Sequence, residues 1–208
     1  MGYNKTKFFL LCCGVVFLLI VLIVLFFVFC KDLGIFSKEI GSDFNSVESV
    51  LGVNKKNECV KRIEQFTVLG NSMSPFIKNG QVVMALFGYY ECNPVERNDV
   101  ILFSYAGEDN PLIKFVKGIP GDLFFLKRDI DFSNLYINNS VVVNTEGVAY
   151  RLDNQGYTML SLYEHDYRGV IPQNAYLILG NSPTGSLDSE RFGLVGKTDI
   201  LAKVILVN

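Results

Sequence analysis

The sequence contains few of the residues that bind metals or attract nucleic acids. Its 208 residues include a single histidine, His165, and no cysteine spacing links a thiol pair to it. A zinc protease is therefore excluded for want of ligands, and no metal site or other cofactor is predicted. The formal net charge of -2 leaves no basic excess for the electrostatic recruitment of nucleic acid. We expect neither metal nor nucleic acid among its partners.

Cysteine is also scarce, and three of the five cysteines lie in an apolar segment near the amino terminus. Cys12, Cys13 and Cys30 act there as small hydrophobic residues or as lipidation sites. Only Cys59 and Cys92 remain. They could form a disulfide if the domain faces an oxidising compartment, or stay as free thiols, and the sequence leaves both possibilities open.

One long hydrophobic run dominates the amino-terminal part of the chain. Residues 8–30 read FFLLCCGVVFLLIVLIVLFFVFC, without a charge or a proline. A helix of this length spans the roughly 30 Å hydrocarbon core of a bilayer. The run is too long for the apolar part of a signal peptide, and Lys31 and Asp32 follow it in place of a cleavage site. We predict a retained transmembrane helix after a short tail, residues 1–7.

The charges beside this run favour one orientation weakly. Lys5 and Lys7 precede it, whereas Lys31 and Lys38 follow it, the former next to Asp32. The positive-inside rule then favours an amino terminus in the cytoplasm. Because every candidate catalytic residue follows the span, we expect a single-pass protein of the plasma membrane with its catalytic domain on the extracytoplasmic side.

The pattern of residue types changes after a polar juxtamembrane connector, residues 31–60. Residues 61–208 consist of short runs of valine, isoleucine, leucine, phenylalanine and tyrosine, separated by glycine, asparagine, aspartate and proline, which is typical of antiparallel β-strands. Asn138 and Asn139 are typical of a hairpin turn, because asparagine tolerates a positive φ. We expect a mainly β domain with few helices. The clearest runs are 81–87, 99–105, 135–137, 141–143 and 176–179.

The first candidate site is a polar stretch, residues 70–75, which reads GNSMSP after the apolar run 66–69. A serine in a tight turn at the end of a strand exposes its hydroxyl, here that of Ser72. The preceding glycine, Gly70, lets the backbone approach a ligand closely. An ordinary solvated turn has the same composition, so this stretch alone does not indicate a function.

The second candidate is Lys114, which lies inside the apolar run 112–117, LIKFVK. Strand alternation would place Ile113 and Phe115 on one face and Lys114 with Val116 on the other. A lysine held among apolar neighbours loses hydration, so its pKa falls and its neutral amine becomes a base near neutral pH. A lysine that extends its amine to solvent fits the same pattern.

The third candidate is the loop 180–193, which reads GNSPTGSLDSERFG after the predicted strand 176–179. It brings small, hydroxyl and charged side chains together, among them Ser186 and Asp188. Such side chains could orient another group by hydrogen bonds, although a plain polar loop has a similar composition.

The three stretches, in this order and behind a membrane anchor, resemble the type I signal peptidases of prokaryotes. The motifs are S-M-x-P, K-x-x-x-G-x-P-G-D and G-N-(x)4-S-x-D-S-(x)3-G, and their combination is far more specific than any one of them. The resemblance implies Ser72 as nucleophile and Lys114 as general base, with Ser186 positioning the lysine amine and Asp188 supporting the loop. It also implies a twisted antiparallel β-sheet or partly open barrel, as in LexA-like self-cleaving repressors.

By the same resemblance, the protein is a membrane-bound serine endopeptidase that removes signal peptides from exported preproteins. Some members carry a hydroxyl residue where this chain has Gly70, so backbone N–H groups alone, among Gly70, Asn71 and Ser72, are expected to hold the oxyanion. The substrate would lie as an added strand beside Val68 and Ile113.

Two departures from the family pattern keep an alternative open. Phe115 follows the lysine where arginine is common, and Glu190 stands where an arginine usually follows D-S. The usual salt bridge of Asp188 is then lost, unless Arg191 substitutes. The alternative is a catalytically impaired or specialised membrane-anchored peptidase-like binding module. A LexA-like autoprotease is disfavoured, because a membrane span occupies the place of its DNA-binding module.

Overall fold

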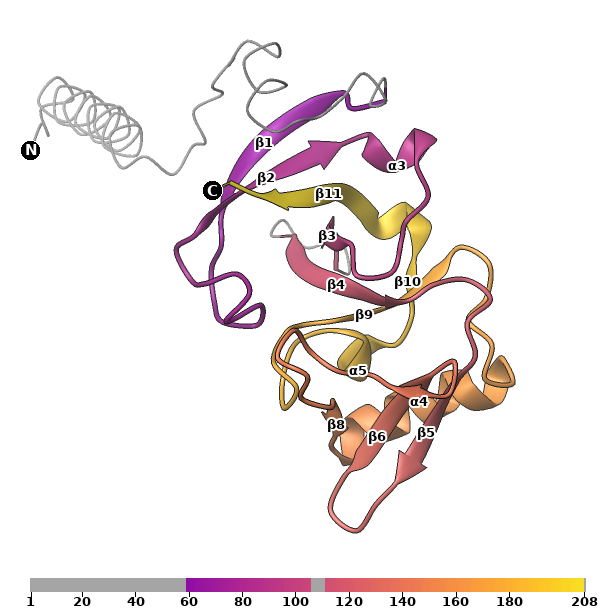
Figure 1. Ribbon diagram of the computed structural model, residues 1–208. Coiled ribbons are helices and arrows are strands. Elements are labelled where there is room, and N and C mark those ends of the chain that lie inside the picture. Colours follow the sequence, from indigo (N-terminus) through magenta and orange to yellow (C-terminus); the bar gives the residue numbers. More distant parts are fainter. Residues whose placement is uncertain (1–58, 106–110, 208) are drawn as a thin grey trace, which may run out of the picture. The chain divides into compact units, whose positions relative to one another are not determined.

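The computed structural model describes residues 59–105 and 111–207 (Figure 1). The predicted tail 1–7, the transmembrane helix 8–30 and nearly all of the connector 31–60 lie outside these residues. In the part that is described, no helix is both long and apolar enough to cross a membrane.

A seven-stranded sheet forms the larger part of the fold, in the order β1-β2-β11-β3-β4-β9-β10. Every strand pairing in it is antiparallel, as the short apolar runs predicted. The carboxy-terminal strand β11 lies between β2 and β3, inside the sheet (Figure 1). The strands are β1 (Arg62–Thr67), β2 (Val82–Phe87), β3 (Val100–Phe103), β4 (Leu112–Gly118), β9 (Ala175–Leu179), β10 (Val195–Gly196) and β11 (Ile200–Leu206).

A smaller antiparallel sheet follows in the chain between β4 and β9. It contains β5 (Phe124–Arg128), β6 (Ser133–Ile137), β7 (Ser140–Val141) and β8 (Arg151–Leu152). The turn between β6 and β7 is formed by Asn138 and Asn139, with φ angles of 48° and 66°. This confirms the hairpin turn predicted from the asparagine pair, since asparagine adopts positive φ more readily than most residues.

The one long helix in the described residues is α4 (Asn154–Asp166), which the sequence pattern did not reveal. Asp153 begins it by accepting a hydrogen bond from the Gly156 N–H at 2.8 Å. Only Gly156 and Leu160 of the helix are fully buried, with Leu160 packing against Phe124 in the core of the smaller sheet. Because so few positions of this helix are buried, the apolar residues in its sequence repeat too weakly at helical spacing for the helix to be predicted. The other helical turns are α3 (Tyr89–Cys92), α5 (Ser189–Phe192) and η1 (Lys197–Asp199).

Two buried clusters lie on opposite faces of the larger sheet, and strand β4 contributes side chains to both. Ile113 and Phe115 pack on the side of Met73 and Ile77, whereas Val116 packs in the cluster of the opposite face. The alternation predicted along this strand is therefore confirmed, and Lys114 points to the same face as Val116.

Of the two possibilities for the last two cysteines, the structure has the disulfide. Cys59 and Cys92 are bonded, with their Cα atoms 5.9 Å apart. The bond joins the segment before β1 to the last residue of α3. It closes a loop across the β1–β2 edge of the sheet and so restricts the unfolded chain there.

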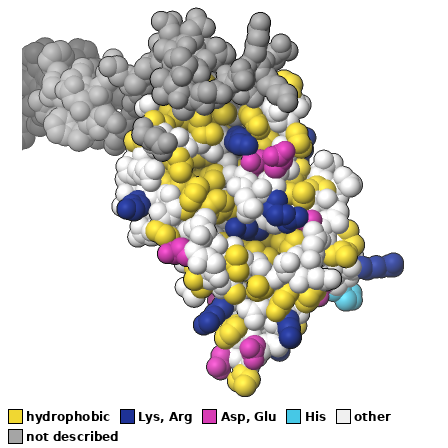
Figure 2. Space-filling view, in the orientation of Figure 1, with side chains coloured by type: hydrophobic (Ala, Val, Ile, Leu, Met, Phe, Trp, Pro, Cys, Tyr) yellow, Lys and Arg dark blue, Asp and Glu magenta, His cyan; other side chains and the backbone are white. Residues whose placement is uncertain are grey.

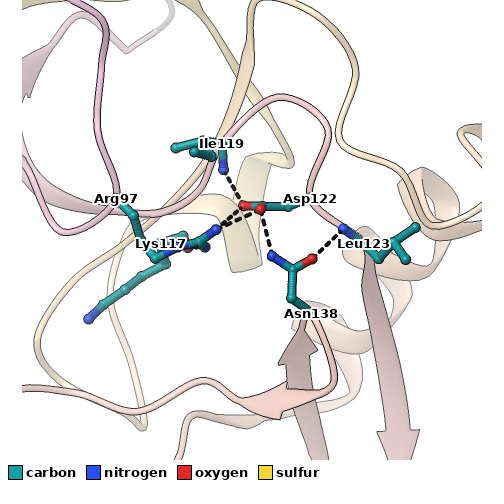
Figure 3. Close-up of polar contacts among 6 residues, drawn as sticks. All are labelled: Arg97, Lys117, Ile119, Asp122, Leu123 and Asn138. Atoms are coloured by element: carbon teal, nitrogen blue, oxygen red, sulfur yellow. Dashed lines mark hydrogen bonds and ion pairs between the residues drawn. The ribbon is translucent and has the colours of Figure 1, made fainter.

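Charged side chains occur in small groups between exposed hydrophobic ones on the face drawn in Figure 2. A network of polar contacts surrounds the buried Asp122, where β4 leads into the smaller sheet (Figure 3). Its carboxylate accepts two bonds from Arg97 Nη2, at 2.6 and 2.7 Å. It also accepts from the Ile119 N–H and from Asn138 Nδ2, each at 2.8 Å. The P-G-D turn therefore links the two sheets through one buried carboxylate.

We expect Asp122→Asn to lower the free energy of unfolding by about 3 kcal/mol, because it leaves the charge of Arg97 without its partner. The measurement is urea denaturation of the full chain in detergent at neutral pH. The matched control is Asp131→Asn, an exposed aspartate in the β5–β6 turn, with an expected change below about 0.5 kcal/mol. Equal effects of the two substitutions would show that the Asp122 network contributes nothing particular.

Candidate active site

Ser72 lies in the loop that joins β1 to β2. The chain turns at Gly70, whose φ of 89° is accessible mainly to glycine. The Gly70 N–H donates to Asn79 Oδ1 at 2.9 Å, which closes the loop across its width. Met73 and Ile77 follow and are buried in the core, so the loop is anchored directly after Ser72. The tight turn predicted around a partly exposed serine is present.

Lys114 extends from β4 to this loop. Its Nζ lies within hydrogen-bond distance of Ser72 Oγ, at 2.8 Å, and of the Ile113 carbonyl oxygen, at 3.1 Å. Lys114 is only 2% exposed, so it does not reach out to solvent. Burial lowers the pKa of Lys114 from 10.5 to about 8, against the opposing effect of the Asp188 charge. A substantial fraction of this amine is neutral near pH 8.

Asn181 holds the loop 180–193 against the loop that carries Ser72. Its N–H donates to the Ser72 carbonyl at 2.7 Å, and its Nδ2 donates to the Ser74 carbonyl at 3.2 Å and to Thr145 Oγ1 at 2.9 Å. Its Oδ1 accepts from the Thr145 N–H at 3.0 Å, and the residue is fully buried. Asn181 belongs to the third motif, but the motif alone predicts no role for it. One sequence signal could have indicated a role for Asn181, because this polar residue directly follows an apolar strand and a glycine.

Gly180 lies at a close approach of the two loops. A Cβ atom at this position would overlap Ser186 Oγ and would lie 2.7 Å from the Ser72 carbonyl oxygen. The Gly180 N–H donates to the Asp188 carboxylate at 2.8 Å, and its carbonyl accepts from the Tyr150 hydroxyl. Only glycine leaves room for this contact.

Ser186 does not make the hydrogen bond to Lys114 that the family resemblance implies. Its Oγ is buried and has no hydrogen bond of normal geometry with any described residue. Burial raises the pKa of Asp188, whereas the N–H groups of Gly180 and Glu190, and more weakly the nearby Ser186 hydroxyl, lower it. Ser186 thus packs between Gly180 and Asp188, and the amine of Lys114 bonds to Ser72 and to its own strand instead.

The expectation that Arg191 could replace the missing partner of Asp188 is wrong. Arg191 pairs with Asp153 at 2.7 Å and bonds to Gln155 at 2.9 Å, both at the start of α4. Asp188 turns its carboxylate towards the backbone and caps α5 through the Glu190 N–H at 3.0 Å. Arg191 therefore bonds to α4, while backbone N–H groups bind Asp188.

The residues predicted to hold an oxyanion lie around Ser72, but they are not equally available. The N–H of Gly70 is already bonded to Asn79. Within the described residues, the N–H groups of Asn71 and Ser72 have no acceptor. These two groups are therefore free to donate to a bound oxygen atom.

The two segments predicted to pair with a substrate, around Val68 and Ile113, also differ in whether their backbone groups are free to bond. Strand β4 pairs with β3 along Leu112–Phe115, but it pairs with β9 only from Phe115 onward. The second edge of residues 112–114 thus has no partner strand in the described structure. Val68 is buried, and its N–H and carbonyl already bond to Gln81 and Gly80. An added strand can pair beside Ile113, whereas the backbone of Val68 is occupied.

Comparison with known proteins identifies proteins to which this chain is similar. Residues 59–208 match the family model for signal peptidase, peptidase S26. A signal peptidase IB of Staphylococcus aureus (strain COL) is 29% identical over 150 residues, which cover 68% of this chain and 75% of that protein. A signal peptidase I of Bacillus caldolyticus is 30% identical over 142 residues, or 67% and 75% of the two chains. A crystal structure of a signal peptidase I from Enterococcus faecalis V583 aligns with a TM-score of 0.38 and 24% identity, over 53% of this chain and 97% of that one.

Proposed function

The chain belongs to the peptidase S26 family of signal peptidases, and we propose that it removes signal peptides with Ser72 as nucleophile and Lys114 as general base. The observation that carries this proposal is the 2.8 Å separation of Lys114 Nζ and Ser72 Oγ, together with the burial of Lys114, which is only 2% exposed. A buried amine with a pKa of about 8, next to a serine hydroxyl, can act as a base at neutral to mildly alkaline pH.

In the proposed reaction, neutral Lys114 takes the proton of Ser72 Oγ, and the oxygen attacks the carbonyl carbon of the scissile bond. The N–H groups of Asn71 and Ser72 stabilise the negative charge that develops on the carbonyl oxygen. The lysine ammonium then protonates the departing amine, which leaves an acyl-enzyme on Ser72. Water, deprotonated by the same amine, hydrolyses the ester and releases the signal peptide. The negative charge of Asp188 stabilises the ammonium form of Lys114, and Ser186 packs beside Asp188.

The substrate is proposed to bind as an extended segment along the unpaired edge of Leu112–Lys114. Main-chain hydrogen bonds at such an edge recognise many sequences equally, as a general processing enzyme requires. Specificity then depends on small side chains at the first and third positions before the cut. Ile113, partly buried beside the core cluster of Phe115, lies next to this segment and contributes apolar surface.

We further propose that residues 8–30 anchor the enzyme in the plasma membrane with the amino terminus in the cytoplasm. The Cys59–Cys92 disulfide supports an extracytoplasmic position of the catalytic domain, since disulfides persist mainly in oxidising compartments. Confinement of enzyme and preprotein to one bilayer raises their effective concentration. Leu69, 87% exposed and three residues before Ser72, places apolar surface beside the site.

The test is cleavage of a preprotein with an Ala-x-Ala site by the full chain in liposomes, with the new amino terminus identified by mass spectrometry. Because the neutral amine is the active form, we expect kcat/KM to rise about tenfold per pH unit at low pH and to level off above about pH 8. A flat profile between about pH 6 and 9 would contradict a lysine base. Absence of both cleavage and labelling of Ser72 by a serine-reactive probe would favour the binding-module alternative.

A further inference from the structure

The connection between β7 and β8, residues 142–150, forms a turn that is closed by its own hydrogen bonds. Val143 and Ala149 pair across it as an isolated antiparallel bridge. The side chain of Asn144 is 5% exposed, and its Oδ1 accepts from two backbone N–H groups of the same turn, each at 2.9 Å. An asparagine that bonds to its own turn in this way fixes the local backbone. The β7–β8 turn is therefore held in shape without help from the catalytic residues.

This turn bonds to the start of the loop that contains Asn181. The Tyr150 hydroxyl donates to the Gly180 carbonyl. Asn144 Nδ2 donates to the next carbonyl, that of Asn181, at 3.1 Å. Thr145 contacts both ends of the Asn181 side-chain amide, because its N–H donates to Oδ1 at 3.0 Å and its Oγ1 accepts from Nδ2 at 2.9 Å. Four hydrogen bonds thus join the turn to two consecutive residues of the loop.

The contact with Thr145 determines which way the Asn181 amide points. A backbone N–H can only donate, so it keeps Oδ1 on the side of Thr145. Nδ2 then also reaches the Ser74 carbonyl, at 3.2 Å. The N–H groups of Asn181 and Ser182 both donate to the Ser72 carbonyl, at 2.7 and 3.3 Å. A displacement of Thr145 would therefore displace the backbone of Ser72 and Ser74.

The same turn also bonds to the strand that carries Lys114. Lys117 lies three residues further along β4 and is 8% exposed. Its Nζ donates to the Val143 carbonyl at 3.1 Å and to Asn98 Oδ1 at 3.2 Å. The β7–β8 turn is thus linked to the loop of Ser72 through Asn181 and to the strand of Lys114 through Lys117.

We propose that the β7–β8 turn of the smaller sheet positions Ser72 relative to Lys114, with Thr145 as a positioning residue that acts through Asn181. This inference rests on the proposed function of Ser72 and Lys114. Proton transfer between them requires that their 2.8 Å separation be kept. The proposed substrate edge, Leu112–Lys114, does not include the turn. A change at Thr145 therefore lowers kcat and leaves KM unchanged.

The test is cleavage of an Ala-x-Ala preprotein by the full chain in liposomes, with kcat and KM measured separately. Thr145→Val replaces the hydroxyl by a methyl group of similar size. We expect its kcat to fall about tenfold, the loss that corresponds to one hydrogen bond, with KM within about twofold of the native value. Labelling of Ser72 by a serine-reactive probe slows by the same factor. Thr145→Ser, which retains the hydroxyl, restores both rates to within about twofold of native.

The matched control is Thr158→Val. Thr158 is an exposed threonine of α4, and its hydroxyl donates to the Asn154 carbonyl of the same helix at 2.7 Å. The control makes the same change of hydroxyl to methyl away from the β7–β8 turn. We expect its kcat and KM to stay within about twofold of the native values.

The outcomes separate this inference from the proposed function. A native kcat in Thr145→Val, or a loss that Thr145→Ser does not restore, overturns the positioning role while Ser72→Ala remains inactive. Activity that survives Ser72→Ala overturns the proposed function instead. If a melting curve shows that Thr145→Val is unfolded, Tyr150→Phe takes its place, because it removes only the hydroxyl that bonds to Gly180. A tenfold lower kcat with unchanged KM in that variant supports the inference, and a native kcat overturns it.

Discussion

Lys114→Arg and Ser72→Ala are each expected to lower kcat/KM for preprotein cleavage by about 10⁴-fold or more. Arginine keeps the positive charge and much of the bulk of lysine, but its guanidinium does not release a proton at any working pH. Alanine removes the attacking oxygen itself. The measurement is cleavage under single-turnover conditions, which resolves residual rates of this size.

The control for this pair of variants is Ser74→Ala. Ser74 is the other serine of the loop that carries Ser72, and its contact with Asn181 is made by the backbone carbonyl, which alanine retains. We expect its rate to stay within about twofold of the native rate. Full activity of Lys114→Arg would require a different base. Loss of activity in Ser74→Ala with retention in Ser72→Ala would exchange the roles of the two serines.

Gly180→Ala is expected to lower kcat/KM by about 100-fold, although it adds a single methyl group far from Ser72 in sequence. The added Cβ would overlap Ser186 Oγ and lie 2.7 Å from the Ser72 carbonyl, so one of the two loops must move. A displacement of about 1 Å at the reacting groups is enough for a loss of that size. The measurement is the same cleavage assay, together with a melting curve to establish that the variant is folded.

Gly185→Ala provides the comparison for this substitution. Gly185 belongs to the same loop, but a Cβ there would meet no atom within 4 Å. We expect its kcat/KM to remain within about twofold of the native value. If Gly180→Ala were folded and equally active, the close approach of the two loops would have no part in positioning Ser72.

The local features of the fold follow from the sequence, because they depend on neighbouring residues. Alternation along β4 predicted which side chains face each core cluster, since side chains of a strand point to opposite faces in turn. The pair Asn138 and Asn139 predicted its turn, because both residues accept positive φ. The ordered motifs around Ser72 and Lys114 likewise sufficed to choose the candidate site.

Tertiary structure alone decided how the candidate residues meet. Ser72 and Lys114 are 42 residues apart in sequence, and their contact depends on the packing of a loop against a distant strand. The lowered pKa of Lys114 follows from its burial, which no short motif encodes. The pairing of Arg191 with Asp153 depends on α4, whose weak apolar repeat escaped detection.

The same division applies to the rest of the site. The sequence determined the family pattern, the residue types and their departures, including Glu190 at a position where arginine is usual. Only the folded chain removed Glu190 and Asp188 from water, and it also gave Asn181 its contacts with the loop that carries Ser72. Hydrogen bonds and pKa values in a buried site depend on atoms contributed by several distant segments, so they become defined only when those segments pack together.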